Sequence, residues 1–408
     1  MKPKFNKISF RPYLHPNNLC PIQIVTPTEG EYIHTFFDVN PISPSGRYLA
    51  CIKLPFAHRL PKPEDEADIC IIDLHEQAMA LVYKTKGWGL CVSAHVCWGS
   101  DDNHLYFNDK EGAEVFAVEY NLNDGSYRRL CGPIYQISKD GEWIFSPNLA
   151  IVNYAQKGYG AVVDEKYGCV PTNVMSDDEG LWRLNASKNT KELIFSKKDA
   201  YNILPDKKPI EGSRMVFFHT KISPDQTKLM QMIRCTFDNS NKQLRYIITM
   251  DLDGKNPKLA LPFELWLSGS HHPDWHPDSL HITMNINFEV MRFCQFKYDG
   301  SEFKIIFPHL RGGGHPSFSK DTRFLITDAY TNEPFSNEEG QTPIRFINSQ
   351  TGEERVICYI NTLSNDTPFD LRCDPHPVWN KDCTKIIFNA TPNGNRQILI
   401  ADVSELVK

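Results

Sequence analysis

Five histidines share one position relative to a repeated marker, and this regularity is the strongest chemical signal in the chain. The marker is an apolar residue followed by a short polar turn and a strand-like run. It occurs at Ile42, Trp98, Ile137, Ile222, Trp275, Phe318 and Trp379. The residues three positions earlier are Val39, His95, Ile134, His219, His272, His315 and His376. Imidazole can bind a divalent metal, transfer a proton near neutral pH or donate to an anion. With only 14 histidines in 408 residues, this register predicts a functional cluster rather than scattered structural histidines.

The neighbours of two register histidines add ligands and charge. Asp374 stands two residues before His376, and residues two apart in an extended segment face the same side, so both side chains could ligate one ion. His315 follows Arg311 and three glycines, which would let the backbone approach the axis. Arg311 and Arg372 bring cations, so this region could hold an acidic sugar. Three further histidines fall off the register and are expected to be structural: His271, His276 and His281.

Seven copies of one unit must position these side chains. The markers recur about every 56 residues, close to the length of one four-stranded propeller blade. Ser, Pro, Asp and Gly supply the turns, and alternating apolar residues supply the sheets. We therefore predict an all-β fold, a seven-bladed β-propeller of four-stranded antiparallel blades, formed as a single domain by residues 1–408. Two stacked sandwiches are the alternative, but no domain break interrupts the period.

Two segments depart from the period. A strand-like run over residues 22–35 precedes the first marker, and we expect it to complete the last blade, because a closed ring leaves no sheet edge exposed. A polar, glycine-containing stretch over residues 157–179 is the longest break in the repeat. Long loops on rigid scaffolds often carry function. We expect this one to cover the mouth of the axial funnel and to bring Tyr159 into it.

Composition narrows the class of partner and compartment. The net charge is −6 and no basic cluster occurs, so neither a nucleic acid nor a membrane surface is an expected partner. No run resembles a secretory signal or a membrane span. The 12 cysteines contain no CxxC pair, which favours buried reduced thiols and a cytoplasmic protein, or a periplasmic one if a leader has been removed. Motifs such as GxSxG, the P-loop, HExxH and GxGxxG are absent.

At two of the register histidines the chain resembles the oligogalacturonate lyase family of β-propellers. That family has a Thr-His-x-x-Trp-x-Pro-Asp blade start and a His-Pro-His-Pro-Ser-Phe-x-Pro-Asp stretch in its last blade. The matching segments here are 272–278 (HPDWHPD) and 374–382 (DPHPVWNKD). The family's histidines bind manganese beside the substrate. The resemblance therefore implies His272 and His376 as ligands of a divalent metal, with manganese expected and calcium or zinc as alternatives.

The resemblance also has departures. Asp374 replaces the first histidine of the family's final pair, and aspartate can serve a hard divalent ion. A ligating glutamine of the family falls on Leu371, which cannot bind a metal, so His315 is the nearest candidate for another ligand. The predicted metal set is His272, His315, Asp374 and His376. The chain is also similar, nearly end to end, to bacterial propellers related to ulvan lyases and other uronate-acting lyases, a group in which glutamine is usual at the position of His95.

These observations predict a polysaccharide or oligosaccharide lyase that cleaves uronate-containing chains by β-elimination. The reaction requires neutralisation of the uronate carboxylate, a base for the C5 proton and an acid for the leaving oxygen. The metal and Arg372 are expected to do the first. Either His95 or His219 is the candidate base, and either Tyr135 or Tyr159 the candidate acid. A glycoside hydrolase in the same funnel, or a non-catalytic propeller that binds a sugar or a protein, are the alternatives.

Overall fold

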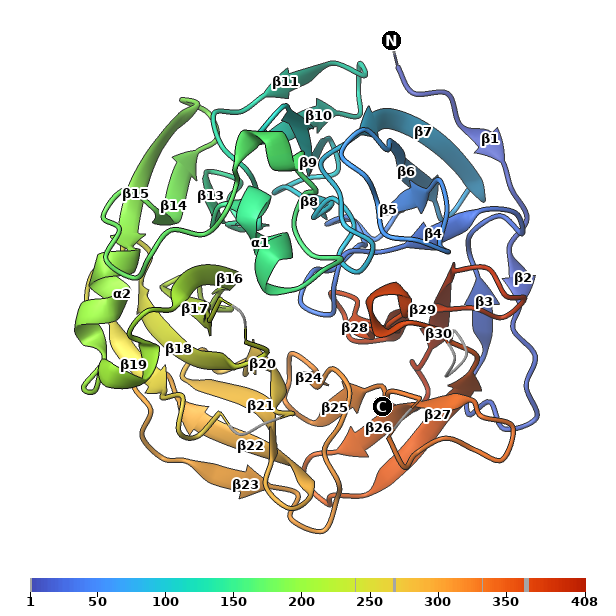
Figure 1. Cartoon of the computed structure of the whole chain (residues 1–408). Helices are drawn as coiled ribbons and strands as arrows, with labels where there is room; N and C mark the ends of the chain where they lie inside the picture. The colour runs from blue at the N-terminus through green and yellow to red at the C-terminus, as the bar shows by residue number, and fades with distance from the viewer. Residues whose placement is uncertain (1, 239, 267–268, 332, 363–366) are drawn as a thin grey trace.

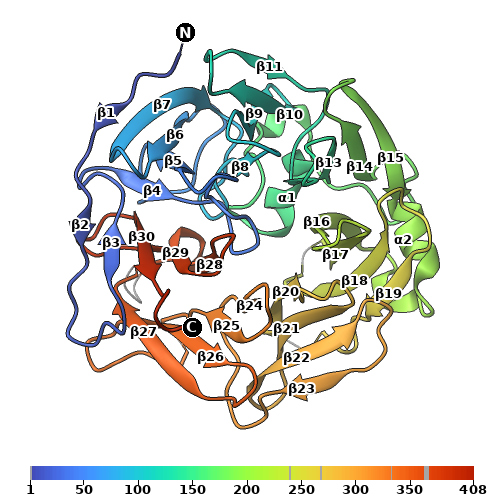
Figure 2. The ribbon, with the colours of Figure 1, turned by 180° about the vertical axis from the view of Figure 1, so that it is seen from behind.

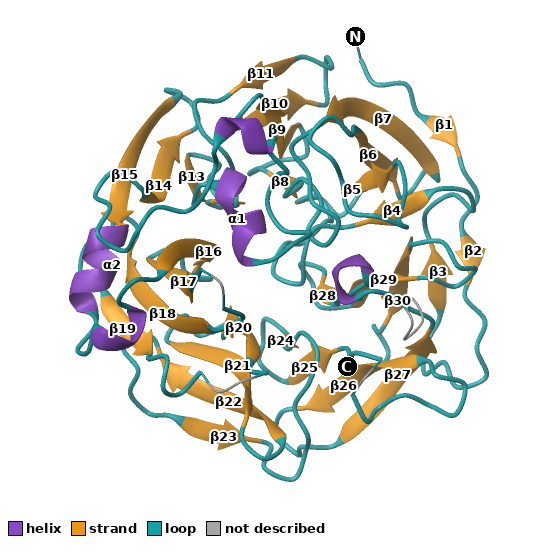
Figure 3. Cartoon of the chain, viewed as in Figure 1, coloured by secondary structure: helices purple, strands orange, loops and turns teal. Residues whose placement is uncertain are grey.

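The computed structural model describes residues 2–238, 240–266, 269–331, 333–362 and 367–408. Seven antiparallel sheets stand around one central axis (Figure 1). The predicted seven-bladed β-propeller is confirmed, and the alternative of two stacked sandwiches is wrong. Helices are few and short (Figure 3). Among the described residues, none of the helices has both the length and the apolar character needed to cross a membrane.

In each blade, consecutive strands run outward from the axis. The first three blades contain the following strands: β4 (Glu31–Ile33), β5 (Tyr48–Leu54), β6 (Ala67–Asp73) and β7 (Ala78–Thr85); β8 (Cys97–Trp98), β9 (His104–Glu111), β10 (Glu114–Asn121) and β11 (Tyr127–Arg129); β12 (Gln136–Ile137), β13 (Trp143–Ser146), β14 (Gly180–Asn185) and β15 (Thr190–Ser196). Blades four and five contain β16 (Arg214–Ile222), β17 (Lys228–Thr236), β18 (Gln243–Asp251) and β19 (Lys258–Leu261); β20 (His271–Trp275), β21 (His281–Asn287), β22 (Met291–Lys297) and β23 (Lys304–Ile306).

The last two blades contain β24 (Ser317–Phe318), β25 (Phe324–Thr327), β26 (Thr342–Asn348) and β27 (Glu354–Ile360); β28 (Val378–Trp379), β29 (Lys385–Ala390) and β30 (Gln397–Asp402), to which β3 (Ile22–Ile24) is added. Two blades depart from the predicted four strands. β1 (Asn6–Lys7) pairs with β7, and β2 (Arg11–Pro12) pairs with β3, so blades one and seven have five strands. These short strands cover two outer sheet edges, which would otherwise present unpaired backbone groups.

The N-terminal segment closes the ring as predicted, but with only part of the expected range. β3 pairs with β30, with Gln23 opposite Ile400, and the view from behind shows these two strands side by side (Figure 2). The remainder of residues 22–35 belongs elsewhere, because β4 pairs with β5 as the innermost strand of blade one. Tyr32 still donates its backbone N–H to Arg396 O at 2.9 Å, so the segment joins the first and last blades.

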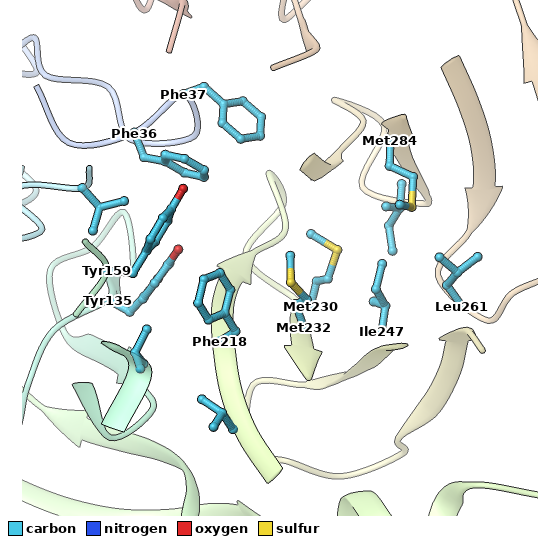
Figure 4. Close-up of a cluster of buried hydrophobic side chains, with 14 of the residues drawn as sticks. Phe36, Phe37, Tyr135, Tyr159, Phe218, Met230, Met232, Ile247, Leu261 and Met284 are labelled. Carbon is cyan, nitrogen blue, oxygen red and sulfur yellow. The ribbon is translucent and has the colours of Figure 1, made fainter. Parts of the chain in front are cut away.

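Apolar side chains fill the spaces between neighbouring blades. One large cluster joins residues of blades two to five to a loop that follows β4, and Figure 4 shows Phe36, Phe218, Met230, Met232 and Met284 within it. Phe36 and Phe37 lie in that loop and are almost fully buried. The loop leaves blade one and reaches the axis, which is where a propeller has its central channel. All twelve cysteines are free thiols and eight are buried.

Five short helical segments interrupt the strand pattern: α1 (Leu149–Ala155), α2 (Lys197–Ile203), and the single turns η1 (Glu165–Tyr167), η2 (Lys208–Ile210) and η3 (Phe369–Leu371). α1 and η3 lie beside the centre of the ring, whereas α2 lies at the rim (Figures 1 and 3). The predicted long loop starts directly after α1. Its first residues approach the axis, since Cys91 donates its backbone N–H to Gly158 O at 3.0 Å. Its later residues extend outward, and Tyr167 lies against Gly112 in blade two.

Candidate active site on the propeller axis

The five register histidines come together at the axis around Phe36. The Phe36 ring lies 4.6 to 6.3 Å, between ring centres, from four of them: His219, His272, His315 and His376. The fifth, His95, lies against Tyr135 at 4.5 Å. Phe36 therefore contacts the register histidines of blades four to seven.

A left-handed backbone turn aims these side chains inward. His95, His272 and His376 have φ of 53°, 56° and 48°, a conformation that costs a residue with a Cβ about 1–2 kcal/mol. In blade six, Gly314 takes the turn with φ 60°, and a Cβ there would lie 2.1 Å from Asp328 O. The glycine run thus allows a close approach to the end of the neighbouring strand, whereas the sequence predicted an approach to the axis. Strain at the same position in separate blades is typical of a functional site.

Three of the four predicted metal ligands form one buried group. His315, Asp374 and His376 each offer one ligand atom, and these three atoms lie within 4.8 Å of one another. His315 Nε2 and both ring nitrogens of His376 are buried and form no hydrogen bond within the described part of the chain. Buried polar atoms without partners are costly. Imidazole nitrogens and a carboxylate suit manganese or zinc, so these residues fit a divalent ion.

Asp328 orients His315 for this role, and sequence reasoning missed it. His315 donates its backbone N–H to Asp328 Oδ1 at 2.6 Å, and its Nδ1 lies 2.9 Å from both carboxylate oxygens. Nδ1 therefore carries the proton and Nε2 keeps its lone pair, the usual arrangement of a metal-binding histidine. The available signal was an aspartate that directly follows the apolar strand β25 in the same blade.

His272 lies beside this group without belonging to it. Its ring stacks on His315 with 3.7 Å between ring centres. Its Nδ1 donates to Gly314 O at 2.7 Å, and its Nε2 lies 3.3 Å from the Tyr330 hydroxyl. Because both nitrogens have hydrogen-bond partners, His272 has no lone pair directed at the other three ligands.

Arg372 links the candidate metal group to the predicted loop. Its Nε contacts the two Asp374 oxygens at 2.9 and 2.8 Å, and its Nη2 donates to the Tyr159 hydroxyl at 3.3 Å. Burial lowers the pKa of Arg372, but Asp374 outweighs this effect and holds the pKa above its ordinary value. The loop therefore brings Tyr159 into the site as predicted. Arg311 does not take part, because its side chain is exposed and lies outside the cavity described below.

Burial sets the protonation states of the predicted acids and bases. It lowers the pKa of His95 to about 3 and that of His219 well below its ordinary value, so both rings are neutral at pH 7. Burial raises the pKa of Tyr135 and of Tyr159, so both hydroxyls keep their protons. The Tyr135 hydroxyl contacts His219 Nδ1, and the Tyr159 ring lies 5.9 Å from the His219 ring. Figure 4 shows both tyrosine hydroxyls directed toward Phe36.

A cavity of about 440 Å³ opens beside these residues. It is lined by His219, His271, His272, Tyr159, Tyr330, Glu333, Arg372, Arg234, Arg245, Trp266 and Phe369, among others. His95, Tyr135 and the three candidate metal ligands are not part of this lining. The cavity is large enough for a small sugar and combines aromatic walls with several cations.

Two of the cations were not predicted. Arg234 and Arg245 face each other across β17 and β18, and neither forms an ion pair within the described residues. Arg234 donates to Gln156, and Arg245 donates to Gln243 at 2.7 Å. Arg234 is buried and Arg245 is partly buried, and guanidinium groups without an acidic partner in such places are expected where an anionic ligand binds. Their signal was an arginine within each of two apolar strand sequences.

Comparisons with known proteins give a likeness in structure but none in sequence. No family model and no curated protein matches the chain. An oligogalacturonate lyase from Vibrio parahaemolyticus superposes with a TM-score of 0.68 over 100% of both chains at 14% identity. An oligogalacturonate lyase in complex with manganese gives a TM-score of 0.67, covering 100% of this chain and 99% of the other at 13% identity.

A more distant likeness is to the tricorn protease, with a TM-score of 0.50 over 93% of this chain and 37% of that protein at 9% identity. At such low identities, likeness establishes a fold and leaves the function open. From end to end, this chain has the seven-bladed propeller fold of the oligogalacturonate lyases.

Proposed function

We propose that this protein is a lyase that cleaves uronate-containing oligosaccharides by β-elimination. One observation carries the proposal: a neutral imidazole, His219, and a protonated hydroxyl, Tyr159, line one arginine-rich cavity with their rings 5.9 Å apart. An elimination requires such a base and acid beside a group that neutralises the substrate carboxylate.

Arginines supply the recognition of the carboxylate. Arg234, Arg245 and Arg372 all line the cavity, and a guanidinium group can bind a carboxylate through two parallel hydrogen bonds. A divalent ion held by His315, Asp374 and His376 would add positive charge beside Arg372 and so acidify the C5 proton of the uronate. The acidic oligosaccharide is thus the expected partner.

Of the two predicted bases, His219 is the better placed, because it lines the cavity and His95 does not. When His219 Nδ1 carries the proton and donates a hydrogen bond to the Tyr135 oxygen, Nε2 has a free lone pair and can accept the C5 proton. Tyr135 then acts by fixing this tautomer, in the way that a buried carboxylate fixes the histidine of a hydrolase triad. His95 supports Tyr135 from the other side, through the 4.5 Å contact between their rings.

Of the two predicted acids, Tyr159 is the better placed. Its oxygen accepts a hydrogen bond from Arg372, which leaves its own proton free for the leaving glycosidic oxygen. Base and acid therefore approach the substrate from one wall of the cavity. Phe369 and Trp266 line the same cavity and offer apolar faces against which a sugar ring can stack.

The test is incubation with oligogalacturonate, and with a neutral oligosaccharide of equal length, in the presence of Mn²⁺. We expect an unsaturated uronate product, seen by its ultraviolet absorbance and by mass spectrometry, from the acidic substrate only. A product whose mass has increased by one water would instead indicate a hydrolase. Tight binding without turnover would indicate a sugar-binding propeller, and either result would overturn the proposal.

A further inference from the structure

The turn between β20 and β21 carries two histidines that the fold does not need. The same turn occurs in all seven blades, and its first residue is serine in four of them: Ser43, Ser138, Ser223 and Ser319. In three of these blades the hydroxyl donates to the aspartate of the turn: Ser138 to Asp140, Ser223 to Asp225, and Ser319 to Asp321. A serine therefore suffices to hold the turn, yet blade five has His276 at this position and His281 at the start of the next strand.

The aspartate of this turn divides its two oxygens between backbone and imidazoles. Asp278 Oδ1 accepts the backbone N–H groups of Leu280 and His281 at 2.8 and 3.0 Å. Its Oδ2 lies 3.1 Å from His276 Nδ1 and 2.6 Å from His281 Nδ1. Three ligand-type atoms thus converge on one point.

The backbone holds this arrangement rigidly. His276 donates its N–H to His281 O at 2.8 Å, so the two residues face each other across the base of the hairpin. Their side chains are only 14% and 17% exposed,, and the His276 ring packs on Phe318 at 4.7 Å. A preorganised set of ligands loses little conformational entropy on binding an ion.

Glu302, from the neighbouring hairpin, provides an outer partner. Its Oε2 lies 3.7 Å from His281 Nε2, while its other oxygen contacts Lys297. If His281 binds an ion through Nδ1, its proton lies on Nε2, and the Glu302 carboxylate can then accept a hydrogen bond from that N–H. A carboxylate behind a ligating histidine is the usual support of a zinc site.

We propose that His276, Asp278 and His281 form a second divalent metal site, of the zinc class, at the opposite end of β20 from the axial histidines. Bonds of about 2.0–2.1 Å in a tetrahedral site place ligand atoms roughly 3.3 Å apart, and the separations of 3.1 and 2.6 Å here need only a small outward rotation of the side chains. Two imidazoles with one carboxylate, and a fourth position open to water, suit Zn²⁺, Co²⁺ or Ni²⁺ better than Ca²⁺ or Mg²⁺. His276 and His281, expected from the sequence to be structural, are thus assigned to a site.

The test is titration of the full-length protein with Co²⁺, followed by visible absorbance, and with Zn²⁺, followed by calorimetry. His276→Ser restores the residue found in four sister blades, so the variant should fold with unchanged circular dichroism. We expect it to lose one equivalent of bound metal, or to bind that equivalent at least about tenfold more weakly, since loss of even an outer partner costs this much. Zn²⁺ should also raise the melting temperature of the unmodified protein more than that of the variant.

His104→Ser is the matched control. His104 contacts the turn aspartate of blade two, Asp101, at 2.9 Å, but no second histidine faces it, so its loss should leave metal uptake unchanged. An equal number and affinity of bound Co²⁺ ions in the unmodified protein and in His276→Ser would overturn the proposal. The comparison is independent of the axial group, because His315, Asp374 and His376 are intact in all three proteins.

Discussion

Asp328→Asn tests whether the axial group is built to bind a metal. In the unmodified protein both Asp328 oxygens contact His315 Nδ1 at 2.9 Å, and Oδ1 also accepts the His315 backbone N–H. The amide oxygen of asparagine can retain the backbone bond, but its NH₂ group then faces Nδ1. That contact is favourable only if Nδ1 loses its proton, which moves to Nε2 and removes the lone pair that would bind an ion.

The magnitude follows from these contacts. Loss of an outer carboxylate partner weakens metal binding by about 10–100-fold, or roughly 1.4–2.7 kcal/mol. The free energy of unfolding should fall by about 1–3 kcal/mol, the cost of a poorly matched buried polar group. Burial raises the pKa of Asp328, but His315 outweighs it and holds the pKa below its ordinary value. The carboxylate thus stabilises the fold above about pH 4, and the difference in stability between the two proteins should shrink as the pH falls through the lowered pKa.

The assay is Mn²⁺ titration by calorimetry or electron paramagnetic resonance, with urea unfolding at pH 7 and at about pH 3, below the unfolded pKa of aspartate. Asp321→Asn is the control for metal binding, because it makes the same change in an exposed turn of the same blade and should leave the Mn²⁺ affinity unchanged. NMR of the His315 ring would report the tautomer directly. Unchanged Mn²⁺ affinity in Asp328→Asn, together with an unchanged His315 tautomer, would refute the reasoning.

Three further predictions concern catalysis and pH. Arg372→Lys keeps the charge, but the lysine cannot contact Asp374 and Tyr159 together, so kcat/KM should fall by about 10²–10³. Arg311→Lys, at an exposed position, is the control and should have no effect. Equal kinetics for the two variants would contradict the assignment. Tyr159→Phe should lower kcat by about 10²–10⁴ with little change in KM, and Tyr167→Phe in the same loop is its control; a change confined to KM would make Tyr159 a binding residue only. Burial lowers the pKa of His34, His95 and His271 to about 3, so each stays uncharged in the folded state while the unfolded chain takes up protons below about pH 6.5. Each histidine should therefore cost about 1.4 kcal/mol of stability per pH unit below that value. Urea unfolding across this range checks the trend, and a stability that is flat from pH 7 to 5 would contradict it.

The same burial changes the expected acid limit of metal binding. From ordinary imidazole behaviour, binding should weaken below about pH 6. Burial holds the pKa of His376 well below its usual value, so this ligand remains deprotonated to lower pH. The acid limit for His376 is therefore set by unfolding of the protein rather than by protonation of the folded site.

The fold and the register histidines were predictable because both repeat. Each blade contributes the same turn and the same strand start, so His315 and His376 could be placed at the axis from their spacing alone. Single buried polar residues carry no such signal. Asp328, Arg234 and Arg245 lie in or beside apolar strands, and only the assembled sheets show that they face His315 or the cavity. The exclusion of His272 from the metal group also follows from a three-dimensional detail, the hydrogen bond to Gly314 O.

Blade one contributes an apolar side chain, rather than a histidine, to the axial site. At the register position it has Val39 in place of a histidine, and its chain leaves β4 to insert Phe36 at the axis. That ring contacts both His376 and His219, at 4.6 and 5.2 Å. An apolar side chain at this place contributes to the burial that lowers the pKa of both imidazoles, because it excludes water. Blade one thus places a phenylalanine rather than a histidine at the axis, and this ring helps to keep both the candidate base and the candidate metal ligand neutral.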